Sequence, residues 1–253
     1  MNATLHPTAI ISPKATLGTG VSVGPFSIIH GDVEIGDGAT IDGHCEIGYP
    51  TPLAEGRPLV LGRGARIRSH SVFYQGSSFG EGLVTGHRVT VRELTTAGRS
   101  FQIGTMADIQ GYCEIGHHVR TQSSVTIGQK SRIGNFVWLF PGALLTNDPT
   151  PPSDELLGVI LEDYVVVGVK ATLLPGVRIG RGSFVAAHSL VGTDMVAGSM
   201  VSGSPAKRVC DVSVVRMKND VRAKAYPWAG RFTRGYPDEV VQAWAQGKFD
   251  FEF

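Results

Sequence analysis

Four side chains in the middle of the sequence are suited to work on a small polar substrate. Asn147 and Asp148 stand together before a proline-rich run, where an amide and a carboxylate can orient a ligand or simply shape a turn. His87 titrates near neutral pH, which suits a general base, but the same ring could form a hydrogen bond at a corner or subunit interface. Glu93 could accept a hydrogen bond from a sugar hydroxyl or be a surface charge. Residue type alone leaves both roles open at each position.

A sequence period of six determines how these residues are placed. From Leu61 to Leu145 every sixth residue is apolar except Thr85 and Thr121, and glycine often follows it. Neither an α-helix, with a period of 3.6, nor a flat strand, with a period of 2, produces this pattern. Three six-residue units make an 18-residue triangular coil with one apolar residue on each inner side. The period therefore predicts a parallel β-helix. The small residue is expected at a corner, where a larger side chain would collide or where a positive φ is needed.

The repeat predicts one long domain with two loops. Its three blocks are Ile11–Ile47, Leu61–Leu145 and Leu161–Ala197. The phase slips between blocks predict loops at 49–60 and 146–160 that leave the coil. The repeats amount to about nine to ten coils and a prism roughly 45 Å long. We expect a β-helix domain over 1–208 and a C-terminal tail over 209–253 with two short helices, at 212–225 and 238–246.

Residues 18 apart are expected to stack on one face. Glu93, Gly111, Gln129 and Asn147 then form one outward polar column, with a hollow at Gly111 where a ligand could approach the backbone. His87 belongs to a different column and lies 60 residues before Asn147. Three strand spacings, roughly 14 Å, would separate the two along the axis, so they cannot act on one atom within a single chain.

Composition excludes several function classes. The chain of 253 residues has a formal net charge of +1, which gives no electrostatic footprint for nucleic acid or a membrane surface. Cys45, Cys113 and Cys210 show no metal-binding spacing, and we expect free thiols in a reducing compartment. The first residues lack a secretory signal pattern, and no apolar run approaches a transmembrane length. We expect a cytoplasmic protein.

Three groups of motifs resemble the hexapeptide-repeat acyltransferases, whose fold is a left-handed parallel β-helix. Leu5-His6-Pro7-Thr8-Ala9-Ile10 is similar to the opening of the O-acyltransferases of lipid A synthesis. Leu174-Pro175-Gly176-Val177 and Gly203-Ser204-Pro205-Ala206-Lys207 look like CoA-dependent acetyltransferases. Thr85-Gly86-His87-Arg88 and Leu145-Thr146-Asn147-Asp148 are similar to N-acetyltransferases that act on dTDP- or UDP-linked amino sugars for surface polysaccharides. The left hand is implied by this resemblance, not by the period.

The resemblance implies an acetyl-CoA-dependent N-acetyltransferase that acts as a homotrimer and needs no metal. Asn147 and His87 would be catalytic, and Asp148, Glu93 and Gly111 would bind substrate. The pantetheine arm of CoA would pass Gly168 and Ala186, and Lys207 and Arg208 would meet its phosphates. The lipid A enzymes have a catalytic His where this chain has Gly111, which argues against their reaction.

Other functions remain open at this stage. One is an O-acyltransferase that uses acyl carrier protein or a longer acyl-CoA. A second is a non-enzymatic β-helix scaffold. A third is a metal-dependent relative of the carbonic anhydrases, for which His70, His87, His117 and His118 are the available ligands.

Overall fold

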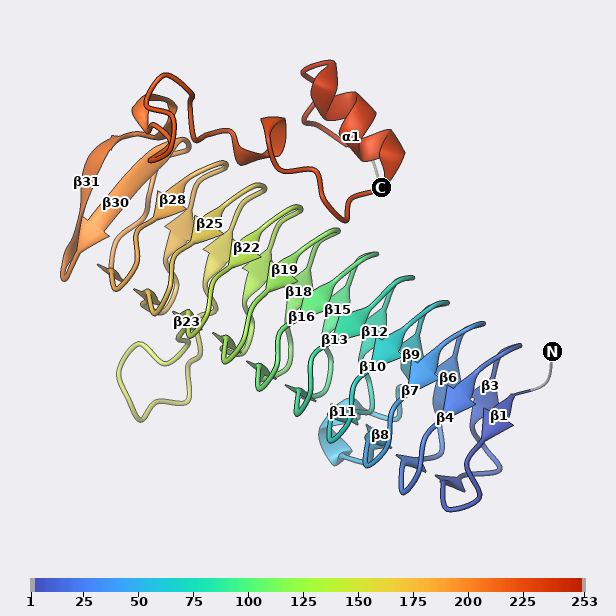
Figure 1. Cartoon of the computed structure of the whole chain (residues 1–253). Helices are drawn as coiled ribbons and strands as arrows, with labels where there is room; N and C mark the ends of the chain where they lie inside the picture. The colour runs from blue at the N-terminus through green and yellow to red at the C-terminus, as the bar shows by residue number, and fades with distance from the viewer. Residues whose placement is uncertain (1–2, 252–253) are drawn as a thin grey trace.

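The computed structural model describes residues 3–251 and shows a parallel β-helix with three sheets (Figure 1). Sheet A has the order β1 (Thr4–Leu5), β4 (Ser22–Val23), β7 (Thr40–Ile41), β10 (Arg66–Ile67), β13 (Val84–Thr85), β16 (Gln102–Ile103), β19 (Arg120–Thr121), β22 (Trp138–Leu139), β25 (Val166–Val167), β28 (Phe184–Val185), β30 (Ser199–Gly203) and β31 (Ala206–Asp211). Sheet B has β2 (Ile10–Ile11), β5 (Ile28–Ile29), β8 (Glu46–Tyr49), β11 (Val72–Tyr74), β14 (Thr90–Val91), β17 (Asp108–Ile109), β20 (Thr126–Ile127), β23 (Leu144–Leu145), β26 (Thr172–Leu173) and β29 (Leu190–Val191). Sheet C has β3 (Thr16–Leu17), β6 (Val33–Ile35), β9 (Leu59–Leu61), β12 (Ser78–Phe79), β15 (Thr96–Ala97), β18 (Glu114–Ile115), β21 (Arg132–Ile133), β24 (Ile160–Leu161) and β27 (Arg178–Ile179).

The 18-residue register predicted from the period is confirmed. In sheet B, Ile109 pairs with Ile127, and Ile127 pairs with Leu145, always in parallel. The second residue of each short strand points inward, so similar apolar types stack into one continuous core along the prism. The two exceptions to the apolar pattern, Thr85 and Thr121, are buried as well, and their hydroxyls accept hydrogen bonds from the backbone N–H groups of Arg68 and Gly104.

Close packing between coils requires glycine at the repeated positions. The φ angles of these glycines do not require it. A Cβ atom at Gly104 would lie 2.1 Å from the carbonyl carbon of Gln122 in the next coil, and one at Gly86 would lie 2.4 Å from the Thr105 nitrogen. Positive φ occurs two residues later at each corner, where non-glycine residues such as Arg88 (φ 56°) and Met106 (φ 59°) adopt it. Of the two reasons for a small corner residue, collision is therefore the correct one.

The stack is longer than the period suggests. Between residues 3 and 251, sheet A contains eleven parallel strands, from β1 to β30, so the prism has about eleven coils instead of nine to ten. The sequence period is regular only from Ile11 to Ala197. The extra coils come from β1, whose Leu5 pairs with Val23, and from β30, whose Val201 pairs with Val185.

Two insertions leave the coil between consecutive strands. The first lies between β8 and β9 and contains a 3₁₀ turn, η1 (Pro52–Ala54), for which the Thr51 side chain accepts a hydrogen bond from the Leu53 N–H group. The second runs between β23 and β24 and projects from the prism as a long loop (Figure 1). Both lie where the phase of the repeat slips.

The described part of the tail, residues 209–251, contains one α-helix, not two. After the β30–β31 hairpin come two 3₁₀ turns, η2 (Val212–Val214) and η3 (Trp228–Gly230), and then α1 (Asp238–Ala245). The helix expected over 212–225 does not form. The Asp211 and Asp220 carboxylates instead accept hydrogen bonds from the N–H groups of Ser213 and Arg222, which stabilises local turns in competition with a helix.

The tail folds back over the outer face of sheet A (Figure 1). Trp228, Tyr236, Val240 and Trp244 pack there against Tyr164 and Val166, forming a second apolar cluster outside the prism. Among residues 3–251, no helix is long and apolar enough to span a membrane.

Candidate functional site

Asn147 lies at the start of the long loop, shortly after β23. Its carbonyl oxygen accepts a hydrogen bond from Leu157 N–H at 2.7 Å, which closes the loop at its base. Its side chain lies beside Gly128, where a Cβ atom would be 3.2 Å from the Asn147 Cγ. Because Gly128 has no side chain, the Asn147 amide occupies space over the preceding coil and remains partly exposed.

Asp148 organises the same loop. Its Oδ1 accepts hydrogen bonds from the Ser153 hydroxyl at 2.7 Å and the Thr150 N–H at 3.1 Å, and its Oδ2 accepts one from the Ser153 N–H at 3.0 Å. These bonds, led by the Ser153 hydroxyl, lower the pKa of the Asp148 carboxyl. The carboxylate is therefore bound to its own loop, and in this structure it shapes the turn that follows Asn147.

Glu93 and Gly111 lie in the predicted column, but the hollow at Gly111 is filled. The Glu93 side chain is 0% exposed and pairs with Arg92 at 2.9 Å. A Cβ atom at Gly111 would lie 3.4 Å from Glu93 Oε1 and 2.8 Å from the Glu93 carbonyl oxygen. Glu93 thus occupies space beside Gly111. Because its side chain is buried and paired with Arg92, Glu93 is neither an exposed surface charge nor, in this structure, open to a sugar hydroxyl.

His87 is exposed at the corner between sheets A and B. Its Nδ1 forms a hydrogen bond of 2.9 Å with the Ser69 hydroxyl of the preceding coil, which fixes the ring along the corner. His87 directly precedes β14 of sheet B, and two further strands, β17 and β20, separate β14 from β23, the strand that precedes Asn147. The structure therefore does not bring His87 and Asn147 together within one chain.

The residues expected to meet CoA lie near the C-terminal end of the prism. The N–H groups of Gly168 and Ala186 donate to Val185 and Val201 carbonyls, and their own carbonyls accept from Ala171 and Ser189. Only the second lone pairs of these carbonyl oxygens are left for a ligand. Lys207 and Arg208 lie exposed on β31, where Arg208 Nε donates to the Ser199 hydroxyl at 3.3 Å.

The cysteines and histidines form no metal centre in the part of the chain that the structure describes. No group of three or more His, Cys, Asp or Glu side chains could hold a metal ion there. The three cysteines are free thiols, as the sequence predicts, and burial raises the pKa of the Cys113 thiol to about 12.

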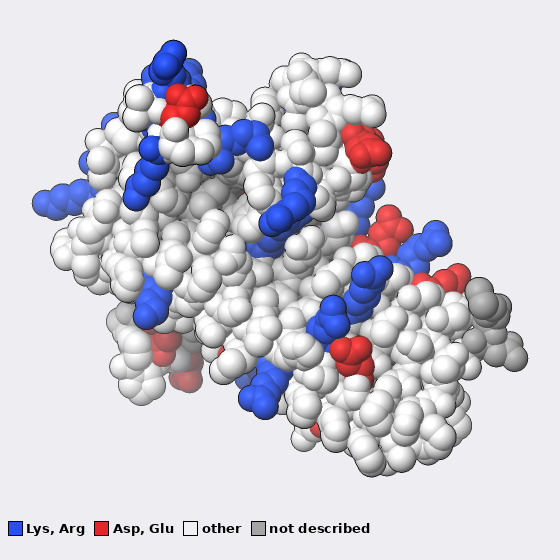
Figure 2. All heavy atoms as spheres, viewed as in Figure 1, with Lys and Arg blue, Asp and Glu red and all other residues white. Residues whose placement is uncertain are grey.

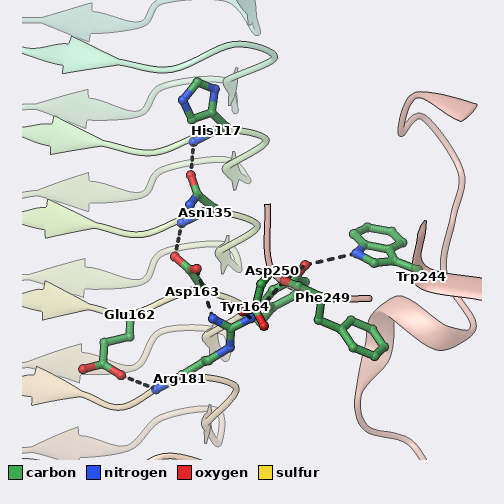
Figure 3. Close-up of polar contacts among 9 residues, drawn as sticks. All are labelled: His117, Asn135, Glu162, Asp163, Tyr164, Arg181, Trp244, Phe249 and Asp250. Carbon is green, nitrogen blue, oxygen red and sulfur yellow. Dashed lines mark hydrogen bonds and ion pairs between the residues drawn. The ribbon is translucent and has the colours of Figure 1, made fainter. Parts of the chain in front are cut away.

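A ladder of polar side chains at the corner between sheets C and A was not predicted (Figure 3). The N–H of Arg99 donates to His117 Nδ1 at 3.1 Å, the N–H of His117 donates to Asn135 Oδ1 at 2.7 Å, and the N–H of Asn135 donates to Asp163 Oδ1 at 2.7 Å. Because His117 Nδ1 accepts, the proton of the neutral ring lies on Nε2. Burial and the charge of Arg99 lower the pKa of His117, which favours this neutral form.

Arg181 connects this ladder to the tail. Its guanidinium contacts Asp163 at 3.4 Å and Asp250 at 2.7 Å, and donates to the Phe249 carbonyl at 2.9 Å (Figure 3). Nearby, Trp244 Nε1 donates to the Tyr164 hydroxyl at 3.0 Å. The 18-residue spacing of polar side chains was the available signal for the ladder, whereas the partners from the tail have no fixed spacing.

An aromatic cavity of about 320 Å³ was also missed by sequence reasoning. It lies between the outer face of sheet A and the tail, and its lining residues are Gln122, Trp138, Phe140, Val166, Tyr226, Trp228, Arg231, Phe232 and Arg234. Gln122 and Phe140 belong to the same corner column as Gly168 and Ala186, each following the inward residue of a sheet A strand. The cavity therefore continues the line on which the CoA arm is expected.

Comparisons with known proteins also identify a six-residue repeat in this chain. Residues 14–49 match the profile of the family described as bacterial transferase hexapeptide (six repeats). An 83-residue stretch is 42% identical to 2,3,4,5-tetrahydropyridine-2,6-dicarboxylate N-acetyltransferase of Staphylococcus aureus (strain JH9). The match covers 33% of this chain and 34% of that protein. The same identity holds for the protein of strain COL. The chain thus matches about a third of the length of these relatives.

Solved structures with a similar backbone include two UDP-N-acetylglucosamine acyltransferases. The Arabidopsis protein is 17% identical, with a TM-score of 0.48, over 82% of this chain and 74% of that one. The Campylobacter jejuni protein is also 17% identical, with a TM-score of 0.42, over 98% and 92%.

Proposed function

We propose that this chain, a hexapeptide-repeat protein, is an acetyl-CoA-dependent N-acetyltransferase that acts on the amine of a dTDP- or UDP-linked amino-deoxysugar. The observation that carries the proposal is the 42% identity over 83 residues to an N-acetyltransferase. The sugar acceptor rests on the Thr146-Asn147-Asp148 sequence at the base of the long loop. The acetylated nucleotide sugar would be made in the cytoplasm and would serve the synthesis of surface polysaccharide.

The proposed reaction needs positioning more than acid–base chemistry. The neutral amine nitrogen attacks the thioester carbonyl carbon, an amide bond forms, the carbon–sulfur bond breaks, and CoA leaves as a thiolate that takes up the proton released by the amine. Asn147 has an amide that can hydrogen-bond the acceptor or the developing oxyanion. Asp148 keeps the following turn ordered. Glu93, ion-paired with Arg92, stabilises the corner at Gly111 that borders the acceptor.

His87 would complete the site from a neighbouring subunit of a homotrimer. Within one chain it lies too many coils from Asn147, but its exposed ring at a corner is available to a second prism packed alongside. In the tautomer whose Nδ1–H donates to the Ser69 hydroxyl, Nε2 is unprotonated and would take the amine proton and pass it to the departing thiolate. CoA would run past Gly168 and Ala186, with Lys207 and Arg208 near its phosphates.

The decisive experiment is an acceptor panel with purified protein and acetyl-CoA. We expect release of CoA thiol with at least one dTDP- or UDP-amino sugar. The panel also contains tetrahydropyridine dicarboxylate, the acceptor named for the similar S. aureus enzymes, and acyl carrier protein with a UDP-sugar. Thiol release only with one of these latter substrates, or with none, would overturn the amino-sugar assignment.

Asn147→Ala tests the site. We expect kcat to fall by about 100-fold because a donor aimed at the reacting group contributes that much. Asn219→Ala, an exposed asparagine in the tail, is the matched control and should leave kcat unchanged. The oligomeric mass of both variants should match the wild type. An unchanged kcat in Asn147→Ala would remove this residue from the site.

A further inference from the structure

The aromatic cavity under the tail has the chemistry of a nucleotide site. Its walls are mainly aromatic, and Trp138, Phe140, Tyr226 and Phe232 are each only partly buried, so their rings present surface to the cavity. Its volume, about 320 Å³, lies in the range of small-molecule pockets, about 300–1,000 Å³. Aromatic rings of this kind provide stacking surfaces for a nucleobase.

The same cavity carries positive charge that the described residues do not neutralise. Arg231 and Arg234 line it and are exposed, and neither forms an ion pair with a carboxylate among residues 3–251. Arg231 Nε donates to the Ala225 carbonyl at 2.9 Å, which holds its guanidinium against the tail backbone. Between α1 and the hairpin Figure 2 shows basic side chains, with an acidic side chain on the lobe of the tail above the hairpin.

A third arginine is fixed beside the cavity. Arg120 is only 8% exposed, and its guanidinium lies 4.0 Å from the Tyr236 ring centroid and 5.1 Å from that of Trp138. It donates to the carbonyls of Arg234 and Gly235 at 3.2 and 2.7 Å. These bonds fix the backbone of Arg234, so the positive edge of the cavity is held in place before any ligand arrives.

We propose that this cavity binds a nucleoside diphosphate, with its base stacked on the aromatic wall and its diphosphate held by Arg231 and Arg234. Bidentate contacts between guanidinium and phosphate oxygens favour this orientation. The ligand is either the nucleotide of the sugar acceptor or the 3′-phosphorylated adenosine diphosphate of CoA, which in the second case would lie here and not beside Lys207 and Arg208. The inference rests on the proposed function for these two sources, but binding can be measured without turnover.

Calorimetric titration of the full chain with dTDP, UDP and 3′-phosphoadenosine 5′-diphosphate tests the proposal. At least one of them should bind, and Arg231→Gln and Arg234→Gln should each weaken that binding about tenfold or more. Arg222→Gln, an exposed arginine of the same tail that does not line the cavity, is the control and should bind as the wild type does. Trp138 and Trp228 line the cavity, so bound nucleotide should also quench tryptophan fluorescence.

The nucleotide that binds shows whether the natural ligand is the sugar acceptor or CoA. If dTDP or UDP binds, both arginine variants should raise KM for the acceptor; if the adenosine nucleotide binds, they should raise KM for acetyl-CoA. The proposal is overturned if none of the three binds the wild-type protein, or if the arginine variants bind them unchanged. Nucleotide binding without acetyl transfer would instead reject the proposed function and leave the cavity assignment standing.

Discussion

At the scale of single residues, the corner at Gly111 is the most constrained position in the candidate site. Gly111 has a φ of 96°, beyond the left-handed region that non-glycine residues of this chain occupy at 53° to 63°. A Cβ atom would also lie 2.8 Å from the Glu93 carbonyl oxygen. Backbone conformation and the lack of space therefore both require glycine at this position.

Replacement of Gly111 by alanine should cost more stability than replacement of a glycine that has only an ordinary left-handed φ and free space around it. Gly38 has a φ of 67°, and no atom lies within 4 Å of the position that a Cβ atom would take there, so Gly38→Ala serves as the control. We expect Gly111→Ala to lower the free energy of unfolding by about 2 kcal/mol more than Gly38→Ala does, because it adds a close contact and an unfavourable φ. Denaturant unfolding followed by circular dichroism measures both, and equal losses would contradict the contact argument.

The column containing Glu93, Gly111 and Asn147 could be predicted from 18-residue spacing alone. The burial of Glu93 could not, because it depends on how the Arg92 side chain turns toward it and on the space beside Gly111. Likewise, the turn role of Asp148 depends on Ser153, five residues away in an irregular loop. Spacing in a repeat determines which residues are neighbours, whereas side-chain pairing determines which of them are exposed.

At the scale of elements, α1 is attached to the prism mainly by aromatic contacts. The centroid of the Trp244 ring lies 5.3 Å from that of Phe136 and 4.8 Å from that of Tyr236. The Trp244 Nε1 also donates a hydrogen bond to the Tyr164 hydroxyl. The apolar spacing of Val240 and Trp244 predicts this helix correctly. No comparable pattern predicts the surface that it covers, since Phe136 and Tyr164 occupy corner positions outside the period of inward apolar residues.

Trp244→Ala should therefore release α1 while the β-helix stays folded. Loss of a buried tryptophan costs about 3–5 kcal/mol, which exceeds the stability expected of a short docked helix on its own. Limited proteolysis should cleave the tail of this variant near α1 and leave a resistant fragment of the prism. Gln242→Ala, exposed on the same helix, should be cleaved as slowly as the wild type. Equal resistance of the two variants would show that other contacts hold the tail.

At the scale of the whole molecule, the prism is a one-dimensional stack with two different ends. Each coil contacts mainly the coils before and after it, so its stability depends on those neighbours. At the N-terminal end, Ile10 is 64% exposed, and no further coil packs against β1, β2 and β3 in the described chain. At the other end, the β30–β31 hairpin and the folded-back tail cover the C-terminal coils.

This asymmetry predicts that the prism opens from its N-terminal end. Hydrogen exchange of the native protein should be fastest in the coil of β1 to β3 and slowest in the coils from β16 to β25, which lie inside the stack and partly under the tail. Ile35→Ala, which removes a buried side chain near the open end, should speed exchange only in the N-terminal coils. Ile127→Ala, in the middle of the same core, should speed exchange in the coils on both sides of β20, because it interrupts the stack where two folded segments meet. Uniform exchange along the prism, or the same response to both variants, would mean that the coils unfold as a single cooperative unit.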